Sequence, residues 1–303
     1  MDFAKDGKML NRVCFSIIAL AAVLTAWIGT SAQINPKVTW PEVDWHKAPI
    51  TAQNRKPAPK RDIAGSWSTA EGANAGTQAK GVQLKPSDGN PEHDVPFTPH
   101  GLEVFKTHKP TEGVNLVPVS QQNDPRNLCE PLGFPRWNHY TLRFAQIFQD
   151  AAKVAVLYDY DNRWRTIWID GRPLPKLLEG GVEIDGQFRE DRWMGYSVGK
   201  WLDDDTLEVQ TVGTMPEDLV WLDNAGRPIS DQARITERFR RVDDDTLEWS
   251  ETIDDPKMYT KPWDALKFVM RLQGIHTEEN EDICSPALYK QYLDAFGSAA
   301  SKQ

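Results

Sequence analysis

The sequence predicts a mainly β protein, most simply a closed or nearly closed antiparallel β-barrel. Segments that alternate apolar and polar residues follow one another through the second half of the chain, with tight turns between them. One turn sequence, Asp-Asp-Asp-Thr-Leu-Glu, occurs at 203–208 and again at 243–248. The chain has 12 tryptophans among its 303 residues, which suits a core built between strands. A two-sheet β-sandwich is the alternative.

Each strand is predicted from its own pattern. The stretch from Lys153 to Tyr160 is apolar and β-branched, and Arg163 to Asp170 has a period near two that breaks at Gly171. A first strand begins around Asp62-Ile63-Ala64-Gly65-Ser66-Trp67, where the tryptophan would close one barrel end. The strands expected further along are 140–148, 153–160, 163–170, 196–201, 206–211, 235–242, 246–253 and 266–272.

The repeated aspartates predict hairpin turns. An aspartate side chain accepts hydrogen bonds from backbone N–H groups two or three residues on, and Thr-Leu then begins the return strand. A calcium loop is the alternative interpretation. Neither copy has the glycine and the bidentate glutamate that such a loop needs, so we expect turns.

Two helices are predicted outside the strands. Thr98 as N-cap and Pro99 at the first helical position begin a short helix that ends near Lys106. A final amphipathic helix spans Pro286 to Phe296. Its apolar face carries Leu288, Tyr292, Leu293 and Phe296.

The first 32 residues have the pattern of a cleavable signal peptide. Lys8 and Arg12 are followed by an apolar stretch from Val13 to Trp27, and Thr30-Ser31-Ala32 offers small residues for cleavage. An uncleaved membrane anchor is the alternative, although the apolar stretch is short for a span. We therefore expect a periplasmic or secreted protein without a stable membrane span. Its parts would be the signal 1–32, an extended proline-rich lead-in 33–61, one β-rich domain 62–297 and a tail 298–303.

The charge of the chain bears on its partners. The formal net charge is −9 at pH 7. Binding to nucleic acid or to anionic lipid needs a cationic surface, so neither is expected. The composition does not decide the oligomeric state.

Cleavage of the signal would leave two cysteines, Cys129 and Cys284. In an oxidising compartment an even pair of cysteines suggests a disulfide. Two buried free thiols are the alternative. Both cysteines stand near prolines in loop-like sequence, which favours the disulfide.

A string of motifs extends through residues 62–285. It comprises Asp62–Trp67, Cys129–Arg136, Ile169–Arg172, Trp193–Trp201, Asp205–Leu207, Trp221–Asp223, Ser230-Asp231, Thr236–Phe239 and Thr252–Trp263. With these motifs the chain resembles a large family of exported, uncharacterised bacterial proteins. The resemblance implies a lipocalin-like β-barrel and an exported protein, and it implies no particular activity.

The chain departs from the family pattern at two positions. Tyr196 and Ile229 stand where relatives often have histidine. If those histidines bind metal or move protons in relatives, this protein does not do so in the same way.

Charged residues at strand ends are the first candidates for a site. Asp170 and Arg172 follow a strand two residues apart, so they point the same way, and we expect them at one barrel mouth. They could hold a polar ligand group or simply pair with each other. Arg136 follows the rigid Gly133-Phe134-Pro135 segment and could clamp an anion or cap backbone carbonyls.

Three further residues are candidates for acid–base chemistry. Glu237 adjoins Arg238 on a strand, so one faces the interior and the other faces out. A glutamate in an apolar cavity has a raised pKa and can exchange protons, although pairing with an arginine is the simpler role. His139 is either a base or a structural residue. Tyr259 either donates to a developing oxyanion or caps a loop.

The leading hypothesis is a barrel that binds a small, largely apolar or aromatic ligand with one polar end. The predicted ligand-binding residues are Arg136, Arg172, Trp168, Trp193, Trp221 and Asp223. A lyase, isomerase or hydratase on the same barrel is the alternative, with Asp170, Glu237, His139 and Tyr259 as catalytic candidates. A purely structural envelope protein is the third possibility.

No cofactor is expected. The chain has no phosphate loop, dinucleotide fingerprint or Cys-x-x-Cys pair. His93, His100 and His108 lie close together in the sequence, but their spacing matches no compact metal motif. We expect no metal site.

Overall fold

The computed structural model describes residues 56–69, 95–139, 145–159, 163–274, 283–292 and 294. The predicted signal 1–32, most of the lead-in 33–61, the tail 298–303 and His93 lie outside the described residues. No helix of the described segments is long and apolar enough to cross a membrane.

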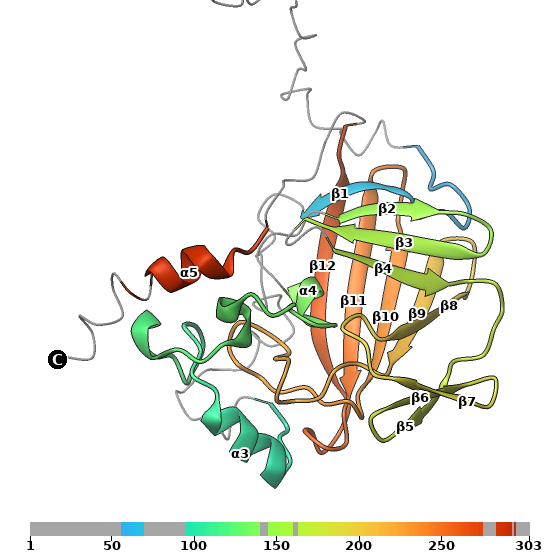
Figure 1. Cartoon of the computed structure of the whole chain (residues 1–303). Coiled ribbons are helices and arrows are strands. Elements are labelled where there is room, and N and C mark those ends of the chain that lie inside the picture. The colour runs from blue at the N-terminus through green and yellow to red at the C-terminus, as the bar shows by residue number, and fades with distance from the viewer. Residues whose placement is uncertain are drawn as a thin grey trace, which may run out of the picture. The chain divides into compact units, whose positions relative to one another are not determined.

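The described strands form a closed barrel, as Figure 1 shows, which confirms the predicted fold class. The order around the barrel is β1-β12-β11-β10-β9-β8-β4-β3-β2, and β2 pairs with β1 to close it. The bounds are β1 Gly65–Thr69, β2 Ala145–Gln149, β3 Lys153–Tyr158, β4 Arg163–Trp168, β8 Tyr196–Trp201, β9 Thr206–Val212, β10 Arg234–Arg241, β11 Thr246–Asp254 and β12 Trp263–Leu272.

One neighbouring pair departs from the antiparallel expectation. β4 and β8 run parallel, with Ile167 opposite Ser197 and Trp168 opposite Val198. The other pairs of the described barrel are antiparallel. The chain between β4 and β8 makes a separate three-stranded sheet, β5 Lys176–Leu178, β6 Gly181–Ile184 and β7 Gln187–Glu190, which the sequence patterns did not predict. This excursion returns the chain to the end at which β4 began, so β8 must run parallel to β4.

The repeated aspartate sequences form turns. Asp203 Oδ1 accepts hydrogen bonds from the backbone N–H groups of Asp205 at 2.8 Å and Thr206 at 2.6 Å. In the second copy Asp243 Oδ1 accepts from the N–H of Asp245 at 3.1 Å. The carboxylates of 243, 244 and 245 lie within 4.8 Å of one another. Because backbone groups and neighbouring side chains use their oxygens, the turn interpretation accounts for them.

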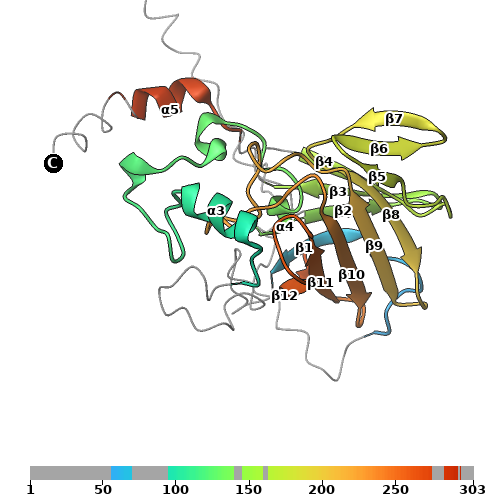
Figure 2. The same ribbon diagram turned by 90° about the horizontal axis from the view of Figure 1, so that it is seen from below.

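The helices are short and form no part of the barrel wall. α3 spans Pro99–Thr107, and Thr98 Oγ1 accepts from the N–H of Gly101 at 2.9 Å, as the N-cap prediction requires. α4 is a single turn, Arg136–His139, and all four of its residues are buried. α5 spans Pro286–Tyr292 of the predicted Pro286–Phe296, and residues 293, 295 and 296 lie outside the described residues. Figure 2 shows α3 and the sheet β5–β7 on different sides of the barrel.

A disulfide joins the connection between β1 and β2 to the C-terminal part of the chain. Cys129 caps the short 3₁₀ helix η4, Pro125–Leu128, and bonds Cys284 just before α5. Their Cα atoms are 5.5 Å apart, within the range of ordinary disulfides. The cysteine prediction is therefore confirmed.

The core has two apolar clusters with a polar layer between them. The first cluster fills the barrel and includes Trp67, Phe239 and Trp249. The second lies against the loops that cover one end and includes Phe134, Ile253 and Tyr259. Along β10 the inward positions run Ile235, Glu237, Phe239, so the glutamate falls between the two clusters. The strand period therefore decides where buried charge can lie.

Candidate functional site

A groove of about 670 Å³ lies on the outer wall of the barrel. Trp168 is at the end of β4, and Tyr196 and Val198 are on β8. These three alternate with the inward-facing Ile167 and Ser197, so their side chains face out. The opposite side of the groove comes from β6 and the turn after it, and its floor comes from the segment after β4. The groove is lined by Trp168, Asp170, Gly171, Arg172, Pro173, Leu174, Pro175, Glu183, Ile184, Asp185, Arg192, Tyr196, Ser197 and Val198.

Asp170 and Arg172 pair with each other at the edge of this groove. Arg172 Nε donates to Asp170 Oδ1 at 2.9 Å, and Nη2 donates to Oδ2 at 2.7 Å. These hydrogen bonds lower the pKa of Asp170. The guanidinium carbon of Arg172 lies 3.7 Å from the centre of the Trp168 ring. The predicted residues Trp168, Asp170 and Arg172 therefore form one unit, a guanidinium held flat by a ring and a carboxylate.

A second cation lies on the other side of the groove. The guanidinium carbon of Arg192 is 4.7 Å from the centre of the Tyr196 ring. Arg192 is exposed, and among the described residues no carboxylate lies within 4.0 Å of its nitrogens. Its neighbour Asp191 has a buried Oδ1 without a hydrogen-bond partner, and burial together with the charge of Asp231 raises its pKa to about 6. The groove thus combines aromatic and aliphatic walls with guanidinium groups at its rim.

A second group of polar residues lies inside the barrel. Arg165 and Glu237 are fully buried and form two hydrogen bonds, Nη1 to Oε1 at 3.1 Å and Nη2 to Oε2 at 2.5 Å. Arg165 also donates to the hydroxyls of Ser197 at 2.9 Å and Thr211 at 2.7 Å. Burial raises the pKa of Glu237, and the charge of Arg165 opposes that shift only in part.

Glu251 and His139 continue this interior network. Glu251 is directly opposite Glu237 across the β10–β11 pair, and Asn138 Nδ2 donates to both carboxylates, at 2.7 and 2.9 Å. His139 Nε2 lies 2.5 Å from Glu251 Oε1. The other ring nitrogen, Nδ1, is buried without a hydrogen-bond partner. Tyr158 completes the group by donating to Asn138 Oδ1 at 3.1 Å.

Arg136, Trp221 and Asp223 lie in the loops at one end of the barrel. Arg136 is buried and donates to both carboxylate oxygens of Asp124, at 2.8 and 2.5 Å. Burial alone would raise the pKa of Asp124, but the charge and hydrogen bonds of Arg136, together with the N–H and charge of Arg126, outweigh burial and lower the pKa. Trp221 packs beside this pair, and Asp223 accepts from Arg227 Nη1 at 2.7 Å. These three predicted residues are thus joined to neighbouring loops and lie apart from the groove.

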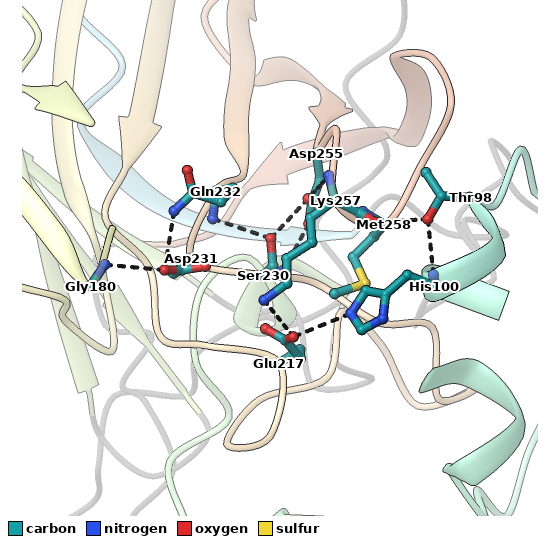
Figure 3. A network of polar contacts seen from close by, with 11 residues as sticks. Thr98, His100, Gly180, Glu217, Ser230, Asp231, Gln232, Asp255, Lys257 and Met258 are labelled. Atoms are coloured by element: carbon teal, nitrogen blue, oxygen red, sulfur yellow. Dashed lines mark hydrogen bonds and ion pairs between the residues drawn. The ribbon is translucent and has the colours of Figure 1, made fainter. Parts of the chain in front are cut away.

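Tyr259 and several residues of the loop motifs connect neighbouring loops. The hydroxyl of Tyr259 donates to the carbonyl of Pro228 at 2.6 Å. Figure 3 shows how the motif residues tie loops together: Ser230 donates through Oγ and N to Asp255, at 2.8 and 2.7 Å. In the same view Glu217 accepts from Lys257 at 2.6 Å and faces His100 at 3.4 Å.

Trp193 and the described histidines lie in other places. Trp193 packs against the second apolar cluster and borders a pocket of about 200 Å³ with Trp137, Trp164 and Met194. His108 stacks on Trp221 with ring centres 4.5 Å apart, whereas His100 pairs with Glu217. The two histidines therefore have separate partners.

The sequence analysis missed several residues of both groups. Arg165 has the same parity along β4 as the buried Ile167, and Glu251 has the parity of the buried Trp249 and Ile253. Alternate residues of a strand face the same side, so these positions could have been predicted to hold inward-facing charges. No local pattern identified Arg192 or Tyr196 as groove residues, because the groove exists only where β5–β7 lie over the barrel wall.

The chain was compared with protein-family models, with curated proteins and with solved structures, and none of the three comparisons gave a match.

Proposed function

We propose that this protein binds a small, largely apolar ligand with one polar end in the groove beside Trp168. The observation that carries this proposal is the groove itself, at about 670 Å³. Small-molecule sites commonly enclose about 300–1,000 Å³ and combine apolar walls with a few placed polar groups. The disulfide is compatible with an exported protein.

The groove offers two kinds of contact. Leu174, Ile184 and Val198 provide aliphatic surface, and Trp168 and Tyr196 provide rings. A flat ligand can lie against the outer face of a guanidinium that is already stacked on a ring, because that face stays weakly hydrated. This arrangement orders the arginine before the ligand arrives, which reduces the entropy lost on binding.

The proposal is tested with a neutral fluorescent probe, the methyl ester of dansylaminoundecanoic acid, titrated into the purified protein. We expect saturable binding with enhanced dansyl emission. Trp168→Ala should weaken binding of the ester about 5-fold, because an aromatic contact contributes on the order of 1 kcal/mol.

Trp164→Ala is the matched control, because Trp164 is on the same strand, is 67% exposed and lies outside the groove. It should leave the affinity unchanged. The proposal fails if the ester does not bind saturably. It also fails if Trp164→Ala weakens binding as much as Trp168→Ala does, which would move the site to the pocket beside Trp193.

A second candidate function is acid–base catalysis inside the barrel. The observation in its favour is the Glu251–His139 contact with the unpartnered, buried Nδ1. A carboxylate on one ring nitrogen orients the ring and stabilises the imidazolium that forms when the other nitrogen takes a proton. Any turnover found with the purified protein should be lost in Glu251→Gln while affinity for the ester probe is kept. Turnover that survives this substitution would exclude the pair as its source.

A further inference from the structure

A second groove of about 450 Å³ adjoins the first. The two share Gly171, Arg172, Leu174 and Val198, so the segment after β4 borders both. The second groove continues along the outer wall over β8 and β9. Its further lining is Arg61, Ile169, Lys200, Trp201, Glu208 and Gln210, with Gly199 beneath. An elongated ligand in the first groove can therefore extend into the second without leaving the barrel wall.

The charges in the two grooves differ. The first contains three carboxylates, Asp170, Glu183 and Asp185, against two cations, Arg172 and Arg192, so negative charge is in excess there. The second contains Arg61, Arg172 and Lys200 against Glu208. The Glu208 carboxylate already accepts a hydrogen bond from Arg238 at 2.9 Å, so it neutralises the cations of the second groove less effectively. The second groove is therefore the more favourable place for a negative group.

Lys200 is the cation best placed to receive such a group. It is directly opposite Glu208 on the neighbouring strand, yet among the described residues no carboxylate lies within 4.0 Å of its ammonium. Arg172 is already paired with Asp170, and Arg61 lies 3.6 Å from Asp204. An anion at Lys200 gains an ion pair without first breaking another.

We infer that the polar end of the ligand is an organic anion, a carboxylate or a sulfonate, held at Lys200 in the second groove while the apolar part lies against Trp168. The inference depends on the proposed function of the first groove. The expected ligand is therefore an elongated amphipathic acid.

The test compares dansylaminoundecanoic acid with its methyl ester, two probes that differ in one negative charge. We expect the acid to bind the native protein more tightly than the ester at low ionic strength. Lys200→Gln should lower the affinity for the acid about 4-fold, which corresponds to the loss of one solvent-exposed ion pair. It should leave the affinity for the ester unchanged. Added salt should remove the preference for the acid.

Lys267→Gln is the matched control, because Lys267 is exposed on β12 and lines neither groove. It should alter neither affinity. Equal affinities for acid and ester, or an acid affinity that Lys200→Gln leaves unchanged, would overturn the inference. In that case Trp168-dependent binding of the ester would still support the proposed function. Absence of saturable binding by either probe would overturn both.

Discussion

Single residues carry most of the unusual chemistry of this barrel. Arg165 and Glu237 have no measurable solvent exposure of their charged side chains, and a second glutamate lies directly opposite the first. Removing charges from water is costly, and mutual attraction offsets that cost only when the remaining donors and acceptors are satisfied. Ser197, Thr211 and Asn138 supply those hydrogen bonds.

Breaking this pair from one side should be strongly destabilising. We expect Arg165→Met to lower the free energy of unfolding by about 3–5 kcal/mol, because it leaves the Glu237 charge buried without its counter-ion. The double variant Arg165→Met/Glu237→Leu should lose less than the sum of the two single variants. Urea unfolding followed by tryptophan fluorescence measures all three.

Arg238→Met provides the control for this prediction. Arg238 follows Glu237 on the same strand but faces solvent, where it pairs with Glu208. Exposed pairs contribute about 1 kcal/mol or less, so this variant should unfold nearly as the native protein does. If Arg165→Met lowers the free energy of unfolding no more than Arg238→Met does, Glu237 does not depend on Arg165 as a buried counter-ion.

At the scale of elements, close approach between α3 and the turn after β11 positions the loops at one barrel end. A Cβ at Gly101 would lie 2.1 Å from the carbonyl oxygen of Met258. The Met258 carbonyl also accepts from the N–H of Thr98 at 2.9 Å, so it cannot move away without losing that bond. Glycine is therefore required at this position by the packing of two elements.

Gly101→Ala tests this packing. Helix propensity alone would make the alanine more stable by about 1 kcal/mol. We expect the clash to dominate and the variant to lose about 1–3 kcal/mol of unfolding free energy, seen as a lower Tm. Glu103→Ala, two residues along the same helix at an exposed position, should change stability by less than about 0.5 kcal/mol. A Tm for Gly101→Ala above that of the native protein would contradict the close approach.

The strands β5–β7 lack the periodic patterns from which strands are predicted. β7 is exposed along its whole length, so no apolar alternation marks it. The burial of β6 falls on the adjacent Gly181 and Val182 rather than on alternate residues. β6 and the turn after it nevertheless form one side of the candidate site, so the barrel strands alone could not predict that site.

At the scale of the whole molecule, the disulfide links parts separated by 155 positions in the chain. In the chain-entropy account a loop of this length restricts the unfolded state by about 4–5 kcal/mol. We expect the double variant Cys129→Ser/Cys284→Ser to lose an unfolding free energy of that order in urea.

Reduction provides the control for the disulfide prediction. A reducing agent should shift the native unfolding midpoint toward that of the double variant and leave the double variant unchanged. A native midpoint that does not respond to complete reduction would show that the cross-link contributes little to stability.

Local sequence by itself determined the repeating parts of this protein. Alternating or β-branched stretches and the turns between them predicted the barrel strands, the aspartates predicted both turns, and Thr98-Pro99 predicted the start of α3. The strand period also predicted that Glu237 and Arg238 face opposite sides, and in the structure Glu237 is the inward one. Such inferences succeed because they depend on backbone geometry that each residue shares only with its near neighbours.

Only the tertiary structure decided what each candidate side chain meets. It paired Arg136 with Asp124, joined His139 to Glu251 and set Asp170 and Arg172 beside Trp168 in an outer groove. It also made β4 and β8 parallel neighbours. Periodicity states which side of a strand faces the interior. Which strands meet, and what covers their outer face, depends on contacts between residues far apart in the chain, and no local pattern encodes them.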